Sequence, residues 1–474
     1  MSDWTPPEFS HDVLGVYDGF DTVVTVNFSQ KDISNPYVAQ HVAGHEQFHF
    51  FQNFFTLQGL SYYQVVRFIE GLTEDLLLAW RAPIPVPAFH WLQTLPDING
   101  KLSSAHYFDR YVRLFTQLAS THVSVNAVNH WSRSCDPVDI ARCLQENAFK
   151  IDVVNRTFCI SGAPVFQIDY SAICESMAKA MEYFNSISTV ARFENGGSTP
   201  TQDDIATATN KIFNAAGRDM VSHNLLNYTF PLLYLRQSGY DLHEAIHLTI
   251  VLDYISLMNS FSKASLPELG VKDMVKFGTS SSYVYAKLLQ YAYEDKFLPI
   301  FDRLIADPTS FSSIVDYLDE IALVAGVNCV SETHKVLGQY SDTFCNSLRE
   351  AELPRNLWYI RILGSAKVFC QKLKSEPALQ GLTLLLSPSM FLYDSNVGPA
   401  IVCTDKVTYQ LKDPDSVSTE IATFTASLNF VKTLLFGWDH LRVEFGSTSE
   451  SARLAFAKYL QQFGVSIAER ANLP

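Results

Sequence analysis

The chain has 474 residues, of which 47% are hydrophobic and 13% aromatic, and its formal net charge at pH 7 is -14. This composition excludes a disordered chain, and the length accommodates two or three domains with substantial cores. The negative charge disfavours a nucleic-acid partner. No apolar stretch reaches the ~20 residues of a membrane span, and the N-terminus lacks a secretion-signal pattern, so we expect a cytoplasmic protein that does not bind membranes.

The first predicted element is a β-hairpin around Asp18 and Gly19. The segment VLGVYDGFDTVVTVNF alternates apolar and polar residues on both sides of this pair, which is a hairpin signal. We therefore expect a small sheet beside the helix that follows. The edge of one of its strands could pair with an extended peptide.

A helix is predicted from Tyr37 to Gln58. It follows the segment Ser34-Asn35-Pro36, which is typical of a helix start because a capping side chain precedes a proline. It carries His45, Glu46 and His49 in the pattern H-E-x-x-H. Positions i and i+4 lie on one helix face, so the two imidazoles can share a metal while the glutamate borders the site. This is the layout of zinc-dependent hydrolases. The alternative is a pair of core histidines that bind backbone carbonyls.

A catalytic zinc site also needs a third protein ligand and an open coordination position. Two glutamates on other predicted helices are candidates. Glu70, in VVRFIEGLTEDLLLAW, would return antiparallel to the first helix at about the level of His49. Glu175, in YSAICESMAKAMEYF, has the small Ala178 almost one turn along, which leaves room for metal and water. We favour Glu175 and keep Glu70 as the alternative.

These residues resemble the gluzincin branch of the H-E-x-x-H metallopeptidases, in which a glutamate of a downstream helix, often in an E-x-x-A setting, is the third ligand. The matches are HEQFH at 45–49 and ESMA at 175–178. H-E-x-x-H-F-x-Q followed by T-x-x-G-L, here TLQGL at 56–60, is also similar to a group of poorly described bacterial proteins with this motif. The resemblance covers roughly 40 residues. The separation of the two pieces is unusually long, and Glu70 fits the usual gluzincin spacing better.

The predicted mechanism follows from this ligand set. His45, His49 and Glu175 hold Zn²⁺, and a zinc-bound water is the nucleophile. Glu46 is the general base that takes the proton and passes it to the leaving amine. An oxyanion stabiliser is also expected. Its candidates are His223, Tyr228, Tyr283 and Tyr285.

A second H-E-x-x-H string runs from His243 to His247. Asp241 and Glu244 fit the D-x-x-E pattern of a helix start, which explains this glutamate without catalysis. Asp253 lies where some zincins have a third ligand, but β-branched Ile250 replaces the glycine that turns their chain. We predict an unbroken helix in which Asp253 points away from the two histidines, so the first motif is the preferred metal site.

The predicted fold is mainly α with small β elements (α+β), in which a zincin-like active-site helix packs with a helical bundle. The predicted units are a zincin-like metallopeptidase domain (residues 1–194), a helical domain or continuation of the catalytic domain (200–386), and a C-terminal α+β segment (387–474). In the last segment MFLYDSN (390–396) and AIVCTDKVTYQL (400–411) are predicted strands. The eight cysteines form no C-x-x-C pair and are expected to be reduced thiols, several of them buried.

The predicted function is a zinc metallopeptidase that hydrolyses peptide bonds of an intracellular protein. Its expected partners are a protein or peptide substrate and a regulatory protein that acts through the helical segment. One alternative is a catalytically inactive helical interaction or scaffold protein with a degenerate zincin fold. Another is zinc-dependent hydrolysis of a small amide. Zinc content separates the enzyme from the scaffold.

Overall fold

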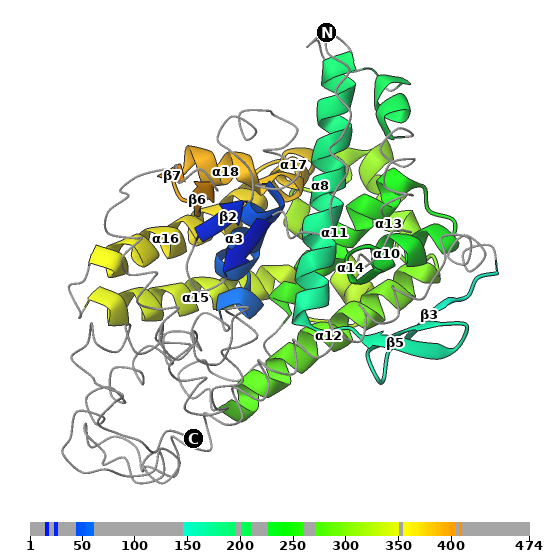
Figure 1. The fold of residues 1–474 in the computed structure, drawn as a ribbon, viewed down its shortest axis with the longest axis horizontal. Helices are drawn as coiled ribbons and strands as arrows, with labels where there is room; N and C mark the ends of the chain where they lie inside the picture. Colours follow the sequence, from blue (N-terminus) through cyan, green and yellow to red (C-terminus); the bar gives the residue numbers. More distant parts are fainter. Residues whose placement is uncertain are drawn as a thin grey trace, which may run out of the picture.

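The computed structural model describes residues 15–18, 23–26, 44–60, 146–194, 201, 203–209, 226–259, 271–349, 354–403 and 408–409. In these stretches the fold is mainly helical with small β elements, as predicted from the sequence (Figure 1). The predicted alternative ligand Glu70, the candidate His223 and the start of the first predicted helix lie outside them. The division into three units stays a prediction.

One sheet joins the two ends of the described chain. Strands β1 (Gly15–Asp18) and β2 (Val23–Val26) pair antiparallel, which confirms the predicted hairpin. Strand β2 also pairs in parallel with β6 (Ala400–Cys403), which pairs antiparallel with β7 (Thr408–Tyr409). The strand order is β1-β2-β6-β7, so β1 is an edge strand among the described strands.

A second sheet was not predicted. Strands β3 (Phe149–Asp152), β4 (Thr157–Ile160) and β5 (Ala163–Gln167) form an antiparallel meander. Its turns contain Arg156 with a φ of 54° and Gly162 with a φ of 81°, the left-handed region that glycine adopts without strain. The sheet leads directly into the long helix α8.

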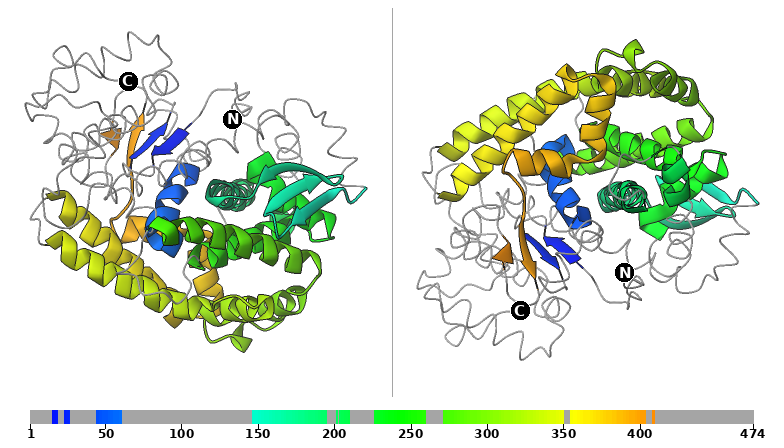
Figure 2. Two further views of the ribbon diagram at one scale, coloured as in Figure 1. Left: turned by 90° about the horizontal axis from the view of Figure 1, so that it is seen from below. Right: turned by 90° about the horizontal axis from the view of Figure 1, so that it is seen from above.

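The helices α3 (Gly44–Phe55) and α8 (Tyr170–Glu194) are the two that the site depends on. Helix α3 lies between α8 and the pair α15 and α16, with β1 and α18 also against it (Figure 2). The other helices are α10 (Leu226–Gln237), α11 (Leu242–Met258), α12 (Val271–Tyr293), α13 (Leu298–Ala306), the 3-10 helix η3 (Pro308–Ser310), α14 (Ile314–Ala325), α15 (Val330–Arg349), α16 (Pro354–Ser375), α17 (Ala378–Leu386) and α18 (Pro388–Asp394).

Aromatic side chains hold α3 in the core on several faces. Phe51 and Phe55 stack on each other and contact the ring of Phe369 on α16, at centroid distances of 5.0 and 5.6 Å. Phe48, Phe50 and Phe54 are also at most 1% exposed. Each fully buried Phe contributes roughly 1.5–3 kcal/mol, so α3 is a rigid support for the residues that it presents.

The strand predicted at 390–396 is wrong, because this segment belongs to helix α18. Ser387 and Pro388 begin the helix, with proline in the first turn where its missing N–H costs nothing. The buried residues are Pro388, Phe391 and Leu392, whereas Tyr393 is 71% exposed. Burial at i, i+3 and i+4 is the helical period, and a strand would have buried alternate residues. The other strand prediction, at 400–411, is confirmed in part, because this segment contains two short strands, β6 and β7, that pair with each other.

The described cysteines agree with the expected reduced thiols. Cys159, Cys174, Cys329, Cys345 and Cys370 are free, and three of them are buried. Among the described helices, none has the length and apolar character needed to cross a membrane.

The T-x-x-G segment after α3 forms a tight turn that requires glycine. The chain bends at Thr56, whose hydroxyl donates to the carbonyl of Gln52 (2.6 Å) and accepts from the N–H of Gly59 (3.1 Å). A short helical turn at 57–60 then packs back against α3. A Cβ at Gly59 would overlap the Gln52 carbonyl oxygen and the Cα of Asn53. No flexible side chain can move to relieve this overlap, because both atoms are backbone.

We expect Gly59→Ala to destabilise the protein by about 2 kcal/mol or more, because the new methyl group displaces the end of α3. Gly364→Ala is the matched control, since Gly364 is exposed within α16 and no atom lies within 4 Å of a Cβ placed there. This control should gain ~0.5–1 kcal/mol from helix propensity. Chemical denaturation of both variants measures the difference. Equal stability of the two variants would contradict the turn geometry.

Candidate metal centre

The structure brings the three predicted ligands together. His45, His49 and Glu175 each offer one ligand atom, and these atoms lie within 4.8 Å of one another. Nε2 of each histidine is 3.3 Å from the same carboxylate oxygen, Oε2 of Glu175. In a tetrahedral zinc site with bonds of ~2.1 Å, neighbouring ligand atoms are ~3.4 Å apart. The two nitrogen–oxygen separations are therefore close to those of a tetrahedral zinc site.

Helix geometry explains the convergence. His45 and His49 are one turn apart on α3, and their ring centroids are 5.0 Å apart. Helix α8 runs antiparallel to α3, because Glu175 contacts the motif while Tyr170, at the start of α8, donates to Asn53 (2.8 Å) near the end of α3. This packing places Glu175 opposite the two imidazoles, although it lies 130 positions after His45.

A side-chain oxygen faces the second ring nitrogen of each histidine, but only that of His49 lies within hydrogen-bond geometry. Nδ1 of His49 is 2.8 Å from Oε1 of Gln52. Nδ1 of His45 is buried, and Oε2 of Glu182 lies 3.5 Å away, slightly beyond an ordinary N–H···O distance. When each ring carries a single proton, as a metal ligand must, these oxygens favour Nδ1 as its position. That tautomer directs the Nε2 lone pairs toward the centre, as metal binding requires.

These supporting residues were not predicted from the sequence. Glu182 lies two turns after Glu175 on the same face of α8. Its Oε1 forms an ion pair with Nζ of Lys179 at a distance of 2.8 Å. Lys179 also lies over the ring of Tyr183. Helical spacing could have placed Glu182 and Lys179 on the ligand face. It could not have shown that Glu182 reaches His45.

The pKa values show how strongly the cluster attracts positive charge. Burial by itself lowers the pKa of His45, but the carboxylates of Glu175 and Glu182 outweigh it and raise the pKa to about 10. Burial also opposes protonation of His49, yet Glu175 raises its pKa. Burial by itself raises the pKa of Glu175, but His49 and His45 hold it well below its usual range. Without a metal, protons on the rings balance the carboxylates; a divalent cation can replace them.

Glu46 and Tyr228 border the cluster without belonging to the ligand set. Glu46 is 9% exposed, and its charge contributes to raising the pKa of both histidines. The ring of Tyr228 on α10 is 6.3 Å from that of His45. The negative charge of Glu175, together with burial and Glu46, raises the pKa of Tyr228 well above 10. Its hydroxyl therefore stays protonated and can donate a hydrogen bond.

The other described candidates for oxyanion stabilisation are less suitable. Tyr285 is fully buried, and its hydroxyl is 3.4 Å from that of Ser176. Tyr283 is 44% exposed on α12. Of the three described candidates, Tyr228 is the one whose ring contacts a predicted metal ligand.

The second H-E-x-x-H string begins helix α11 as predicted. Asp241 and Glu244 form a capping box, with reciprocal hydrogen bonds of 2.7 and 2.8 Å. The helix continues unbroken past Ile250, as predicted, and ends at Met258. Glu244 therefore has a structural role at the helix start.

The two histidines of this string lie in different environments. His243 is exposed, whereas His247 is 3% exposed and its Nε2 is 3.3 Å from the hydroxyl of Tyr317. Burial lowers the pKa of His247 to about 3, so it is a neutral core residue. Asp253 points to Ser176 on α8 instead. Within the described stretches, these residues belong to no group of three potential ligands close enough for one metal.

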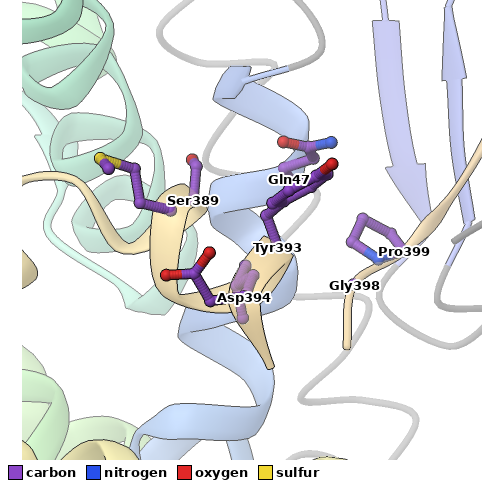
Figure 3. Close-up of a pocket in the computed structure, with 8 residues that line it drawn as sticks. Gln47, Ser389, Tyr393, Asp394, Gly398 and Pro399 are labelled. Atoms are coloured by element: carbon purple, nitrogen blue, oxygen red, sulfur yellow. The ribbon is translucent and has the colours of Figure 1, made fainter. Parts of the chain in front are cut away.

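A pocket of about 340 Å³ lies on another face of α3 (Figure 3). It is formed by α3, α18 and the segment that leads into β6, and its lining residues are Gln47, Ser389, Met390, Leu392, Tyr393, Asp394, Gly398 and Pro399. Gln47 is two positions from each histidine, which places it on the opposite side of the helix. This pocket is therefore separate from the candidate metal centre.

Comparisons of the chain with protein-family models, curated proteins and solved structures found no match.

We expect His45→Ala or His49→Ala to abolish zinc binding and Glu175→Ala to weaken it by several kcal/mol, because each removes one of three ligands. The exposed His243→Ala is the matched control and should keep the zinc content of the wild type. Elemental analysis of the purified variants measures this. If only His243→Ala or His247→Ala loses zinc, the metal site is on α11. If Glu70→Ala loses zinc and Glu175→Ala does not, the third ligand is Glu70.

Proposed function

We propose that the chain is a zinc-dependent metallopeptidase with a zincin-like arrangement of its active-site helix. The observation that carries the proposal is the convergence of two Nε2 atoms and one carboxylate oxygen, at 3.3 Å from each nitrogen to that oxygen. Two imidazoles and one carboxylate are a ligand set of catalytic zinc, and three protein ligands leave a position open. Glu46, beside this set, has the place of a general base.

The residues around the ligands would have different roles in the reaction. Zinc, when bound, would polarise the scissile carbonyl and lower the pKa of a water molecule toward 7. Glu46 would accept the proton of that water and pass it to the leaving amine. The protonated hydroxyl of Tyr228 would donate to the oxygen on which negative charge develops. Gln52 and Glu182 would keep the two imidazoles oriented.

A peptide is the substrate class that the surrounding fold favours. The edge strand β1 contacts α3, the helix that carries the motif (Figure 2). An extended peptide could add to this edge through main-chain hydrogen bonds. A sheet edge on one side of the active-site helix and a ligand-bearing helix on another also support a zincin-like packing. A small amide would gain little from such an edge, so peptide hydrolysis is preferred.

The test of this function separates metal binding from catalysis. Glu46→Gln keeps the size and hydrogen bonding of the side chain but removes its basicity. We expect zinc content and melting temperature near those of the wild type, with turnover lower by at least ~10²-fold. Substrates are found by comparing cell proteomes exposed to the wild type and to this variant, and their cleavage is then timed.

Two results would overturn the proposal. If Glu46→Gln cleaves the same substrates at the rate of the wild type, Glu46 is a structural residue. If the wild type purified without chelators holds no zinc and takes up none, the chain is better described as an inactive helical scaffold.

A second expectation concerns Tyr228. Tyr228→Phe removes one hydrogen-bond donor from the transition state, so kcat should fall by ~10²-fold while KM and zinc content change little. Tyr283→Phe is the matched control, because it makes the same change at an exposed position of α12. Steady-state kinetics on an identified peptide measures both variants. A large rise in KM with unchanged kcat would assign Tyr228 to substrate binding instead.

A further inference from the structure

One buried amide connects the two helices that supply the candidate ligands. Gln52 is fully buried on α3, one turn after His49. Its Oε1 is 2.8 Å from Nδ1 of His49, and its Nε2 donates a 2.8 Å hydrogen bond to the backbone carbonyl of Cys174. Cys174 immediately precedes Glu175. The same side chain therefore contacts one ligand and the residue next to another.

The two hydrogen bonds of the Gln52 side chain determine which atoms donate and which accept. The Cys174 carbonyl can only accept, so the NH₂ of Gln52 must face it and Oε1 must face His49. Because Oε1 can only accept, His49 must donate from Nδ1. Its Nε2 is then directed toward Glu175. A carboxylate or an apolar side chain at this position could not complete this chain of bonds.

The backbone of Gln52 is also fixed. Its carbonyl accepts the 2.6 Å hydrogen bond from the hydroxyl of Thr56, and Gly59 packs directly against it. The turn after α3 thus limits movement of the helix at the point where Gln52 leaves it. Movement of this turn would shift the amide relative to both His49 and Cys174.

We propose that Gln52 is a positioning residue that fixes the tautomer of His49 and the spacing between His49 and Glu175, and so sets the metal affinity of the site. This inference rests on the proposed metal-dependent function. It assigns to Gln52 a role in coupling α3 to α8 that is distinct from that of the ligands. Residues that orient metal ligands typically change affinity ~10–100-fold when they are replaced.

The experiment compares Gln52 with its neighbour Asn53. Asn53 is 7% exposed and accepts a 2.8 Å hydrogen bond from the hydroxyl of Tyr170, so it also joins α3 to α8 through a buried amide. Within the described residues, Asn53 makes no hydrogen bond to a histidine, whereas Gln52 does. Gln52→Met and Asn53→Leu both remove a buried amide at similar volume. They should lower the free energy of unfolding by comparable amounts.

Metal readouts distinguish the two variants. We expect Gln52→Met to bind zinc ~10–100-fold more weakly in a chelator competition and to change the visible absorption spectrum of the cobalt-substituted protein. Asn53→Leu should keep both properties near the wild type. Gln52→Glu retains an acceptor for His49 but loses the donor to Cys174, so its affinity should lie between those of Gln52→Met and the wild type.

The outcomes separate this proposal from the proposed function. If the wild type binds no zinc, the proposed metallopeptidase function is wrong, and so is the inference about Gln52 that rests on it. If the wild type binds zinc and Gln52→Met matches it in affinity and cobalt spectrum, the positioning role is wrong while the function stands. Equal loss of affinity in Gln52→Met and Asn53→Leu would also overturn it, by assigning a purely structural role to both amides. If Gln52→Met does not fold, unchanged affinity and spectrum in Gln52→Glu overturn the proposal, and weaker binding supports it.

Discussion

The antiparallel packing of α3 against α8 is the interaction on which the site depends. One helix supplies two imidazoles, the other supplies the carboxylate, and neither could hold a metal alone. The contact is stabilised by aromatic burial along α3, by the buried hydrogen bond from Gln52 to the Cys174 carbonyl, and by a partly buried one from Tyr170 to Asn53. Aromatic packing fixes the helix in place, while the hydrogen bonds of Gln52 orient His49 relative to Glu175.

Charge balance is the second constraint. Carboxylates and imidazoles buried so close together are costly unless positive and negative charge match. Lys179 balances part of the charge of Glu182, and the remaining carboxylates raise the pKa of His45 and His49. The metal-free cluster is therefore held together by protons. Replacement of these protons by a divalent cation, as proposed, would keep the balance of charge.

Local patterns in the sequence predicted the parts of the structure that depend on neighbouring residues. The helical period placed His45 and His49 on one face, the D-x-x-E pattern predicted the capping box of α11, and Asp18-Gly19 predicted the first hairpin. The choice of Glu175 rested on a short local pattern. The structure brings Glu175 to the histidines, while Glu70 lies outside the described residues.

Features that depend on distant packing could not be predicted in the same way. The role of Gln52 requires knowing where the Cys174 carbonyl lies, and no local period contains that information. The segment containing Phe391 and Leu392 has apolar residues that suit a strand as well as a helix, and its packing on α3 decided between them. The sequence does not predict the meander before α8, because its strands are short and its turns place non-glycine residues such as Arg156 and Ser161 in the left-handed region.

The sheet beside α3 has a consequence for the order of folding. Strand β2 pairs Val23 with Ala400, so the hairpin near the N-terminus acquires its parallel neighbour only after most of the chain has been made. At ~5–20 residues per second, tens of seconds of synthesis separate the two strands. The four described strands therefore become a single sheet only after His45, His49 and Glu175 have all been synthesised.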